Sequence, residues 1–353
     1  MTKPTVSALI DTYNHERYIE QAIVSVLEQD FPASDMEILV VDDGSTDRTP
    51  EIVHKFAPRV RLLRKKNGGQ ASAFNAGIAA TDAPIVAFLD ADDWWVPGKL
   101  SAVISALERE PEAAGVGHGY YEFHEATEET RICAPRETKF LSLTTPDAAH
   151  EALLAWGRLL TSAFTVRRKT LDRITPIPES LFFCADAPIA LAAMAGGARL
   201  LKEPLCYYRR HSDNLDAVDP KNTAKLRRKC EMNERMFQLL ERQLVRLDVP
   251  SESIAALLYP PWTDAIRLNL RTCGGSRLRA FKTEMQSFRS EVKNPTMGYL
   301  LFKYGIVGPA TLLLPPRRFY QARDWYAKRN LRRFREGLCG PSTVSENPKR
   351  HDQ

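Results

Sequence analysis

Three aspartates stand close together at the end of an apolar run, in the stretch AFLDADDWW at residues 87–95. They are Asp90, Asp92 and Asp93, and two tryptophans follow directly. Like charges at this spacing raise one another's pKa and cost stability unless a cation or strong hydrogen-bond donors compensate. Carboxylate oxygens suit hard divalent ions, which borrow further oxygens from the phosphates of a substrate. The alternative is a solvated acidic turn after an edge strand, since short acidic motifs often arise by chance.

Two earlier apolar runs also end in acidic residues, which favours the metal site over the solvated turn. Residues 5–11 (TVSALID) end at Asp11, and residues 36–43 (MEILVVDD) end at Asp42 and Asp43. Such β-rich runs alternate with apolar residues at helical spacing through the first third of the chain, which predicts parallel strands joined by helices. In such a doubly wound sheet, ligands bind at the carboxyl ends of the strands. We therefore expect the three acidic strand ends to share one crevice.

Composition limits the classes of protein to which the chain can belong. Its 353 residues are 44% hydrophobic and 26% charged, enough for one large α/β domain with an extension or for two domains. The six cysteines show no metal-ligand spacing and the N-terminus has no basic and apolar leader, which indicates a cytoplasmic chain with reduced thiols. No GxGxxG follows a strand, which argues against a dinucleotide oxidoreductase. DTYNHER, after the first strand, lacks the glycines expected of a nucleotidyltransferase.

Six segments in a fixed order resemble glycosyltransferase family 2, whose members use nucleotide sugars and have the GT-A fold. The resemblance covers roughly residues 5–212 and rests on the ordered set more than on any one segment. It implies a Rossmann-like, doubly wound, mostly parallel α/β sheet at residues 1–212. After this domain, the pattern of the chain predicts an all-helical region at 213–340 and a disordered tail at 341–353. The six segments are SALIDTYNHERYIEQAIVSVLEQ, ILVVDDGSTDRT, NGGQASAFNAGI, VAFLDADD, CADAPIALAAMAGG and YYRRH.

The resemblance also implies roles for the first two acidic strand ends. Asp11, Thr12 and Tyr13 lie where the family contacts the nucleobase. Asp43 lies where a carboxylate accepts the imide hydrogen of the base, and Asp42 is its neighbour. This base-contacting acid is the feature that favours a uridine diphosphate (UDP) sugar over other donors.

The stretch NGGQASAFN matches the loop and helix start with which the family approaches the ribose and the diphosphate. Gly69, Gln70 and Asn75 are the expected contacts there, because glycine allows close backbone approach and a helix N-terminus favours anions. In LDADD, the resemblance implies that Asp90 lies near the ribose or a metal-bound water. Asp92 is the expected direct ligand of a divalent metal, Mn²⁺ or Mg²⁺.

Asp93 and His211 complete the expected metal region. By the resemblance, Asp93 caps the next helix or supports the other acids, and His211, at the end of YYRRH, reaches the metal or the diphosphate. Without the family pattern, a histidine in the position of His211 is more often a surface or packed residue, although the two arginines before it suit an anion.

Asp186 precedes the apolar run APIALAAM and matches the catalytic base of the family. By spacing alone it is a candidate helix N-cap, but the family order favours a general base that takes the proton of an acceptor hydroxyl. One such base is sufficient for an inverting reaction. Three departures from the family pattern bear on donor and acceptor contacts: Asp11 in place of proline or threonine, Ala185 in place of glutamate, and Phe74 in place of arginine.

The C-terminal third is helical by its apolar spacing. Apolar residues recur by threes and fours within residues 226–247 and 278–292, which predicts helices packed on each other or on the catalytic domain, with an intermolecular coiled coil as the alternative. Residues 297–314 are apolar but are interrupted by Lys303, three glycines and Pro309. A spanning helix needs about 20 uninterrupted apolar residues, so this stretch is not expected to cross a bilayer.

A basic, aromatic-rich stretch completes the segment at residues 297–337 and is expected to be helical. A basic helix with aromatic residues suits the surface of an anionic membrane. The alternatives are a basic helix packed on the protein and a nucleic-acid patch. We expect peripheral membrane contact and no nucleic acid, because a lipid-linked acceptor would explain the helix. QARDW (321–325) has aspartate where processive synthases carry arginine, which favours transfer of a single sugar.

The sequence therefore predicts a metal-dependent, inverting enzyme that moves a sugar from a nucleotide sugar, with a UDP-sugar favoured, to a hydroxyl of a glycan or lipid-linked acceptor. It predicts a cytoplasmic location at the inner face of the membrane and is compatible with a homo-oligomer. Because of Ala185, the alternative is a catalytically weak or inactive nucleotide-sugar-binding module.

Overall fold

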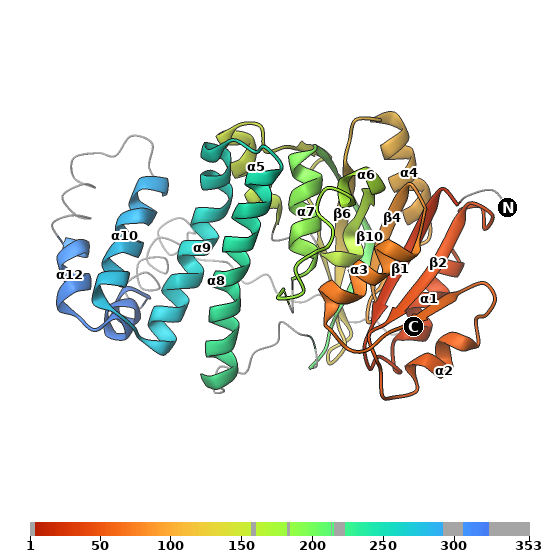
Figure 1. The fold of residues 1–353 in the computed structure, drawn as a ribbon, viewed down its shortest axis with the longest axis horizontal. Helices are drawn as coiled ribbons and strands as arrows, with labels where there is room; N and C mark the ends of the chain where they lie inside the picture. Colours follow the sequence, from red (N-terminus) through yellow and green to blue (C-terminus); the bar gives the residue numbers. More distant parts are fainter. Residues whose placement is uncertain are drawn as a thin grey trace, which may run out of the picture. The chain divides into compact units, whose positions relative to one another are not determined.

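The chain is described by a computed structural model that covers residues 4–156, 160–181, 184–212, 214, 223–291 and 306–324. It divides into two compact units (Figure 1). The sheet unit holds residues 1–222 and 231–262, and the helical unit holds residues 223–230 and 263–353. The sheet unit thus extends beyond residue 212 to two helical segments. The tail expected at residues 341–353 lies outside the described residues.

One ten-stranded sheet forms the centre of the sheet unit. Its hydrogen-bonded order is β3-β2-β1-β4-β9-β6-β10-β5, with β7 paired to β6 and β8 paired to β10. The strands are β1 (Val6–Thr12), β2 (Met36–Asp42), β3 (Arg61–Arg64), β4 (Ile85–Asp90), β5 (Trp94–Trp95), β6 (Gly115–His124), β7 (Glu129–Cys133), β8 (Lys139–Leu141), β9 (Phe164–Arg167) and β10 (Ala198–Arg210).

The first half of the sheet is parallel, and one antiparallel strand separates it from the second parallel pair. β1 lies between β2 and β4, and these three strands and β3 run in one direction. β9 runs antiparallel between β4 and β6, while β6 and β10 are parallel to each other. The mostly parallel, doubly wound sheet expected from the sequence is confirmed. The alternation of strands and helices did not predict the place of β9, because that strand returns to the sheet centre from far along the chain.

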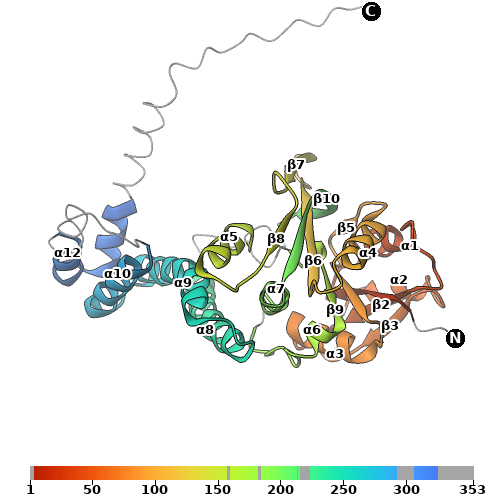
Figure 2. The ribbon, with the colours of Figure 1, turned by 90° about the horizontal axis from the view of Figure 1, so that it is seen from above.

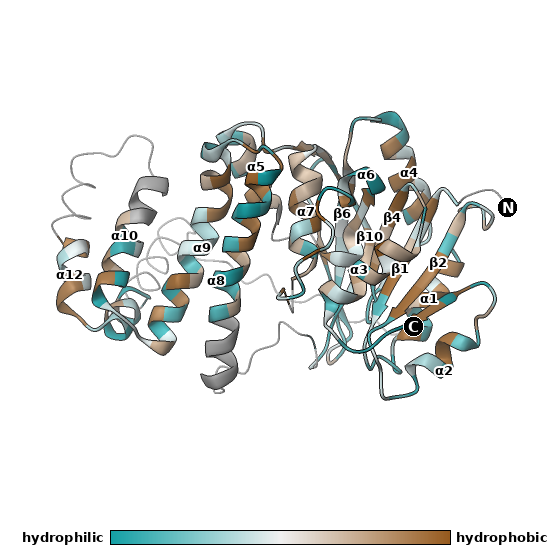
Figure 3. Cartoon of the chain, in the orientation of Figure 1, coloured by the Kyte–Doolittle hydropathy of each residue, from teal (hydrophilic) through white to brown (hydrophobic). Residues whose placement is uncertain are grey.

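Helices cover both faces of this sheet (Figure 2). α1, α2 and α4 share a core with alternate residues of β1, and α3 packs on the opposite face, against Leu9. β1, β2 and β4 are mostly brown in Figure 3, because a strand covered on both faces is apolar throughout. The helices are α1 (Ile19–Leu27), α2 (Thr49–His54), α3 (Gln70–Ala80), α4 (Lys99–Arg109), α5 (Pro146–Trp156), η1 (Thr161–Ala163, a 3-10 helix), α6 (Arg168–Leu171) and α7 (Asp186–Ala195).

α3 lies so close to the sheet that Gly77 has no room for a side chain. A Cβ atom on Gly77 would lie 2.5 Å from Leu9 Cδ1 and 3.0 Å from Val41 Cγ2, and both neighbours are fully buried. We expect Gly77→Ala to lower the free energy of unfolding by about 1–2 kcal/mol, because overpacking outweighs the gain in helix propensity. Ala79→Ser, on the exposed side of α3, is the control, and equal melting temperatures for the two variants would contradict the prediction.

Two helical segments complete the sheet unit and confirm the helical spacing read from the sequence. Residues 231–262 belong to this unit. Leu240 and Leu244 are fully buried there, and the Phe237 ring stacks on Trp262 with 6.1 Å between the ring centroids. The two helices are α8 (Thr223–Arg246) and α9 (Ser251–Cys273).

The helical unit has a small core of its own. Leu278, which the apolar spacing placed in a packed seam, is instead 55% exposed. Residues two apart on a helix are rotated by about 200° about its axis, so they lie on nearly opposite sides. Ala280 is the buried one of the two, and Leu278 is therefore on the solvent side. Helices of this unit include α10 (Arg277–Glu291) and α12 (Gly308–Leu313), and the core residues are Leu270, Ala280, Phe319 and Tyr320.

The segment expected to contact a membrane is described only in part, since residues 297–305 and 325–337 lie outside the described residues. Among the helices that the structure describes, none is long and apolar enough to cross a bilayer. Phe319 and Tyr320 of the basic stretch are buried in the helical unit. The large apolar side chains that remain exposed nearby are Ile306, Leu312, Leu313 and Leu314.

Candidate active site

Strand pairing brings the acidic strand ends together. β1 and β4 pair Asp11 with Asp90, and β1 and β2 pair Thr12 with Asp42. The backbone N–H of Asp43 donates a hydrogen bond to the Thr12 carbonyl over 2.9 Å. All of these residues therefore lie at the carboxyl edge of one sheet, which is where α/β proteins bind ligands.

Four carboxyl groups crowd at this edge. Single oxygens of Asp90, Asp92 and Asp93 lie within 4.8 Å of one another, and the Asp11 side chain is hydrogen-bonded to that of Asp90. Burial and then the negative charges of its neighbours raise the pKa of Asp90 well above its usual value. Burial also raises the pKa of Asp11 to about 7. Without a cation, burial and the neighbouring negative charges therefore make Asp11 and Asp90 harder to ionise than exposed aspartates.

Asp92 differs from the other acids because histidines face it. His211 Nε2 lies 3.0 Å from Asp92 Oδ2, and the His211 ring packs on Tyr18 with 4.9 Å between centroids. Burial alone raises the pKa of Asp92, but the hydrogen bond from His211 and the attraction of His15 and His211 bring it below its usual value. Asp92 is therefore the acid of this cluster that stays ionised. The sequence reasoning missed His15, since nothing in TYNHER indicates that its side chain approaches Asp92.

Asp93 joins two distant segments and does not cap a helix. Its Oδ2 accepts a hydrogen bond from the Ser162 hydroxyl over 2.6 Å, and its Oδ1 accepts one from the Arg209 backbone N–H over 2.9 Å. α4 begins only at Lys99, after Gly98 with φ 84°. The helix cap considered for Asp93 is therefore wrong, and its supporting role is the one that the contacts favour.

Ser162 and Arg209 hold the acids in place, and neither was predicted as a site residue. The Ser162 oxygen accepts the Asp90 backbone N–H over 3.1 Å. Arg209 Nε donates to the Asp92 carbonyl over 2.9 Å. Strand alternation could have indicated Arg209, because it lies two residues before the predicted site residue His211 in YYRRH. Ser162 carries no local signal, since it reaches the site from the separate turn η1.

Asp43 binds the loop that precedes α3. Lys65 Nζ lies 2.6 Å from Asp43 Oδ1, and the Gly69 N–H donates to Asp43 Oδ2 over 2.7 Å. The Gly68 N–H contacts both oxygens, at 3.0 and 3.1 Å. Gly69 has φ 86°, a conformation that glycine adopts without strain. The carboxylate thus has partners within the protein, and its contact with a base imide stays a prediction.

Asp42, Thr12 and Tyr13 have different environments. Asp42 is fully buried, accepts the Ser45 N–H over 2.9 Å and lies 3.1 Å from Arg64 Nε. Thr12 is also buried, whereas Tyr13 is 44% exposed. Among these three, Tyr13 is the side chain that a nucleobase can reach for stacking. The nucleotide contacts expected of Asp42 and Thr12 stay predictions.

Gln70 and Asn75 both lie on α3 but have different partners. Gln70 Nε2 donates to Asp90 Oδ1 over 2.9 Å, which links α3 to the acids. The Asn75 side chain exchanges two hydrogen bonds with the backbone of Ile177, of 2.7 and 2.8 Å. Asn75 therefore anchors the segment that leads to α7, and its contact with a nucleotide stays a prediction.

Asp186 opens α7 and lies close enough to the acids for its charge to raise the pKa of Asp90. Burial raises the pKa of Asp186 itself to about 6, and the backbone N–H groups of Asp186 and Ala187 oppose this rise. The residue in the cap position is Ala185, which makes no side-chain hydrogen bond. A carboxyl group whose pKa lies near the working pH suits a general base.

Comparisons with known proteins agree with this geometry. The family model described as glycosyl transferase family 2 matches residues 7–171. An uncharacterized glycosyltransferase of Nostoc sp., alr2836, is 36% identical over 215 residues, which cover 59% of this chain and 66% of that protein. Residues 7–171 form a domain of glycosyltransferase family 2. EpsJ of Bacillus subtilis, also an uncharacterized glycosyltransferase, is 31% identical over 230 residues, or 61% of this chain and 64% of EpsJ.

Solved structures show that this family 2 chain has the GT-A fold. The structure of Staphylococcus aureus TarS 1–349 matches with a TM-score of 0.57 and 19% identity, and covers 81% of this chain and 88% of that chain. The same protein in complex with UDP-GlcNAc matches with a TM-score of 0.52 and 21% identity. The chain spans slightly less than two thirds of the length of the two curated relatives, alr2836 and EpsJ.

Packing accounts for two departures from the family 2 pattern. Phe74, in place of arginine, is fully buried and contacts Phe88 edge-on with 5.2 Å between centroids. Ala185, in place of glutamate, is also fully buried. A charged side chain at either position would have to lose its hydration, which is costly without a partner.

The acid cluster of this glycosyltransferase family member fits a divalent cation. Its carboxylate oxygens are the ligands that Mg²⁺ and Mn²⁺ prefer, and their spacing allows one ion to contact more than one of them. Asp11 Oδ1 is buried and has no hydrogen-bond partner among the described residues. Asp92 and His211, 3.0 Å apart, are the side chains that would hold the ion, with Asp90 beside them.

Proposed function

We propose that this chain is a metal-dependent, inverting glycosyltransferase that moves a sugar from a nucleotide sugar, with a UDP-sugar favoured, to a hydroxyl of a glycan or lipid-linked acceptor. The observation that carries the proposal is that two carboxyl groups of one site have pKa values shifted in opposite directions. The pKa of Asp92 is lowered, whereas the pKa of Asp186 is raised to about 6. Carboxyl groups with pKa values pushed apart can take different roles, one as a permanent anion and one as a base.

The residues of the chain define one catalytic step. Asp186 accepts the proton of the acceptor hydroxyl while the hydroxyl oxygen attacks the anomeric carbon. The bond from that carbon to the nucleoside diphosphate breaks, and attack from the opposite face inverts the configuration with a single base. A cation held by Asp92 and His211 would supply positive charge to the departing diphosphate.

A relative and two residues of the chain support a UDP-sugar donor. Poly(ribitol-phosphate) β-N-acetylglucosaminyltransferase TarS of Staphylococcus aureus is 37% identical over 92 residues, which are 25% of this chain and 16% of TarS. One structure of that protein is a complex with UDP-GlcNAc. The exposed Tyr13 and the acid Asp43 follow β1 and β2 at the same edge of the sheet, where a base could stack and donate its imide hydrogen.

Nucleotide sugars should stabilise the full chain only together with a divalent cation. A UDP-sugar at about 100 times its Kd should add about 2.7 kcal/mol to the free energy of unfolding. A thermal-shift panel of UDP-, GDP- and dTDP-sugars, with and without Mn²⁺, measures this effect. Release of free sugar from the stabilising donor then measures activity. If no UDP-sugar stabilises the fold in a metal-dependent way, the donor proposal is wrong.

A catalytically weak or inactive nucleotide-sugar-binding module is the second candidate, because Ala185 stands where the family has a glutamate. No carboxylate can assist Asp186 from that position, which is fully buried. The two candidates differ in one result. The binding module would bind the donor but show neither transfer nor slow donor hydrolysis with any cation.

Peripheral membrane contact through residues 297–337 belongs to the same proposal. Residues 312–314 expose three leucines, and Arg317 and Arg318 are exposed close behind them. Exposed leucines next to arginines suit an anionic lipid surface. A cytoplasmic location at the inner face of the membrane would place the chain near such an acceptor.

A further inference from the structure

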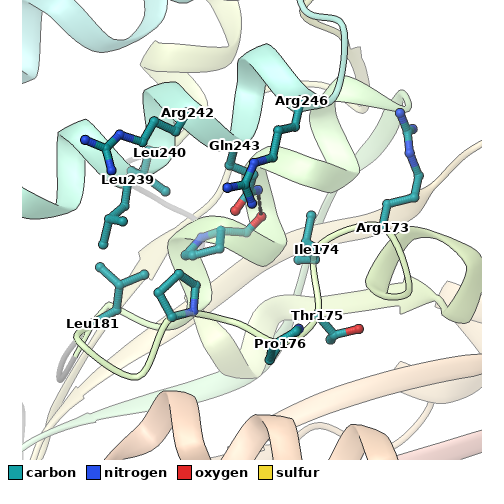
Figure 4. A pocket seen from close by; sticks show the side chains of 12 residues that line it. Arg173, Ile174, Thr175, Pro176, Leu181, Leu239, Leu240, Arg242, Gln243 and Arg246 are labelled. Atoms are coloured by element: carbon teal, nitrogen blue, oxygen red, sulfur yellow. Dashed lines mark hydrogen bonds between the residues drawn. The ribbon is translucent and has the colours of Figure 1, made fainter.

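A pocket of about 270 Å³ lies within the sheet unit, apart from the acid cluster (Figure 4). One wall is α8, and the other is the segment between α6 and α7 together with the first turn of α7. Both walls belong to the same compact unit. No residue of the site described above lines this pocket.

The lining combines apolar side chains with arginines. Leu181, Leu239 and three prolines supply most of the apolar part. Arg173, Arg242 and Arg246 are exposed at its edge, and Figure 4 shows that the last two extend from the same helix. No acidic residue lines the pocket, and no acidic side chain of the described residues forms an ion pair with any of the three arginines. Within the part of the chain that the structure describes, the pocket therefore offers positive charge without an acidic partner above an apolar surface.

The pocket is built on the helices that carry the proposed site. Pro188, which lines it, lies two residues after Asp186 on α7. Gln243 Nε2 donates to the Pro188 carbonyl over 2.7 Å and so fixes α8 to α7 (Figure 4). The loop wall is fixed by Asn75 of α3 through its two hydrogen bonds to Ile177. A ligand in the pocket would thus lie next to the helix that positions the base.

We propose that this pocket binds the phosphate of a lipid-linked acceptor and the first part of its apolar chain. The planar guanidinium of arginine forms paired, charge-assisted hydrogen bonds with phosphate oxygens. Leucine and proline side chains bind an alkyl chain, and neither a free anion nor a sugar would use them. This inference rests on the proposed function, because it names the class of acceptor whose hydroxyl Asp186 deprotonates.

Decyl phosphate is a suitable probe because it carries both a phosphate group and an alkyl chain. With UDP and Mn²⁺ saturating, so that the donor site is filled, isothermal titration of the full chain should show decyl phosphate binding. Arg242→Gln/Arg246→Gln should bind it at least about tenfold more weakly, since charge-assisted hydrogen bonds are lost. Inorganic phosphate, which lacks the chain, and decyl maltoside, which lacks the phosphate, should also bind at least about tenfold more weakly.

Arg235→Gln is the matched control, because Arg235 is an exposed arginine of α8 outside the pocket. It should bind decyl phosphate with the affinity of the parent. Equal affinities of the double variant and the parent would overturn the proposal, and so would equal binding of inorganic phosphate, which would indicate a site for free anions. If decyl phosphate binds through the arginines but no nucleotide sugar binds with Mn²⁺, the pocket stands and the proposed glycosyltransferase function fails.

Discussion

Asp186→Asn should lower the rate of sugar transfer by about 10²–10⁴-fold and leave metal-dependent UDP binding intact. An amide cannot take the proton of the acceptor, and Asp186 is not among the residues expected to touch the nucleotide. Release of UDP measures the rate, and isothermal titration measures binding. Asp82→Asn, at an exposed position before β4, is the matched control and should keep the parent rate. If Asp186→Asn transferred sugar at the parent rate, the base would be another residue.

The same carboxyl group predicts how activity and stability depend on pH. Because the base must be ionised, the rate should rise as the pH passes through about 6. Burial raises the pKa of Asp186 from its usual 3.8 to about 6, so the folded state binds this proton more tightly than the unfolded chain does. Ionisation therefore destabilises the fold progressively as the pH rises through this interval.

Asp186→Asn should consequently be more stable than the parent above pH 7, by up to about 3 kcal/mol. The advantage should shrink to a small fraction at pH 4 and disappear below about pH 3, where the parent carboxyl is protonated in both states. Thermal unfolding of both proteins without metal, at pH 4 and pH 8, measures the difference. A variant that is equally stable with the parent at both pH values would show that the Asp186 carboxyl ionises without cost.

Asp92→Asn should weaken the apparent affinity for Mn²⁺ by more than about tenfold, because even partners outside the metal shell cost 10–100-fold when they are removed. Asp92 is the acid of the cluster whose pKa is lowered, so its charge is available to a cation at neutral pH. Titration of Mn²⁺ into the chain with UDP measures the affinity. Treatment with a chelator should abolish transfer by the parent, and added Mn²⁺ should restore it.

Asp93→Asn is the informative comparison for this variant. Asp93 accepts hydrogen bonds from Ser162 and Arg209, so its replacement should lower the melting temperature. Its effect on the affinity for Mn²⁺ should be smaller than that of Asp92→Asn. An unchanged Mn²⁺ affinity in Asp92→Asn would remove Asp92 from the metal site. Full transfer activity after exhaustive chelation would remove the metal from the reaction.

Local sequence determined much of the fold and the place of the site. Apolar runs that end in acid predicted strands ending at Asp11, Asp42 and Asp90, and the structure ends β1, β2 and β4 at or next to these residues. Strands that alternate with helices form a parallel sheet, and the carboxyl ends of parallel strands lie at one edge. Periodicity and chain order alone were therefore enough to predict that these acids lie at one edge of the sheet.

Only the tertiary structure decided which partner each side chain has. Asp93 meets Ser162 and Arg209 across 69 and 116 residues of chain, and Asn75 binds Ile177 across 102. No local pattern encodes such contacts, because they depend on how strands and turns from separate parts of the chain pack. The same holds for the different pKa values of Asp90 and Asp92, which follow from burial and from the position of His211.

The sequence by itself thus determined an α/β chain with its acids at one sheet edge, since strand order and residue type are local properties, and its six ordered segments resemble glycosyltransferase family 2. The tertiary structure decided which acid stays ionised and which one joins β10 to η1. It also formed the pocket lined by arginines, because Arg173 and Arg246 line the same pocket only when α8 packs beside the segment before α7. Burial, charge and hydrogen-bond partners are set by the whole fold, and these are the quantities that give otherwise similar carboxyl groups different chemistry.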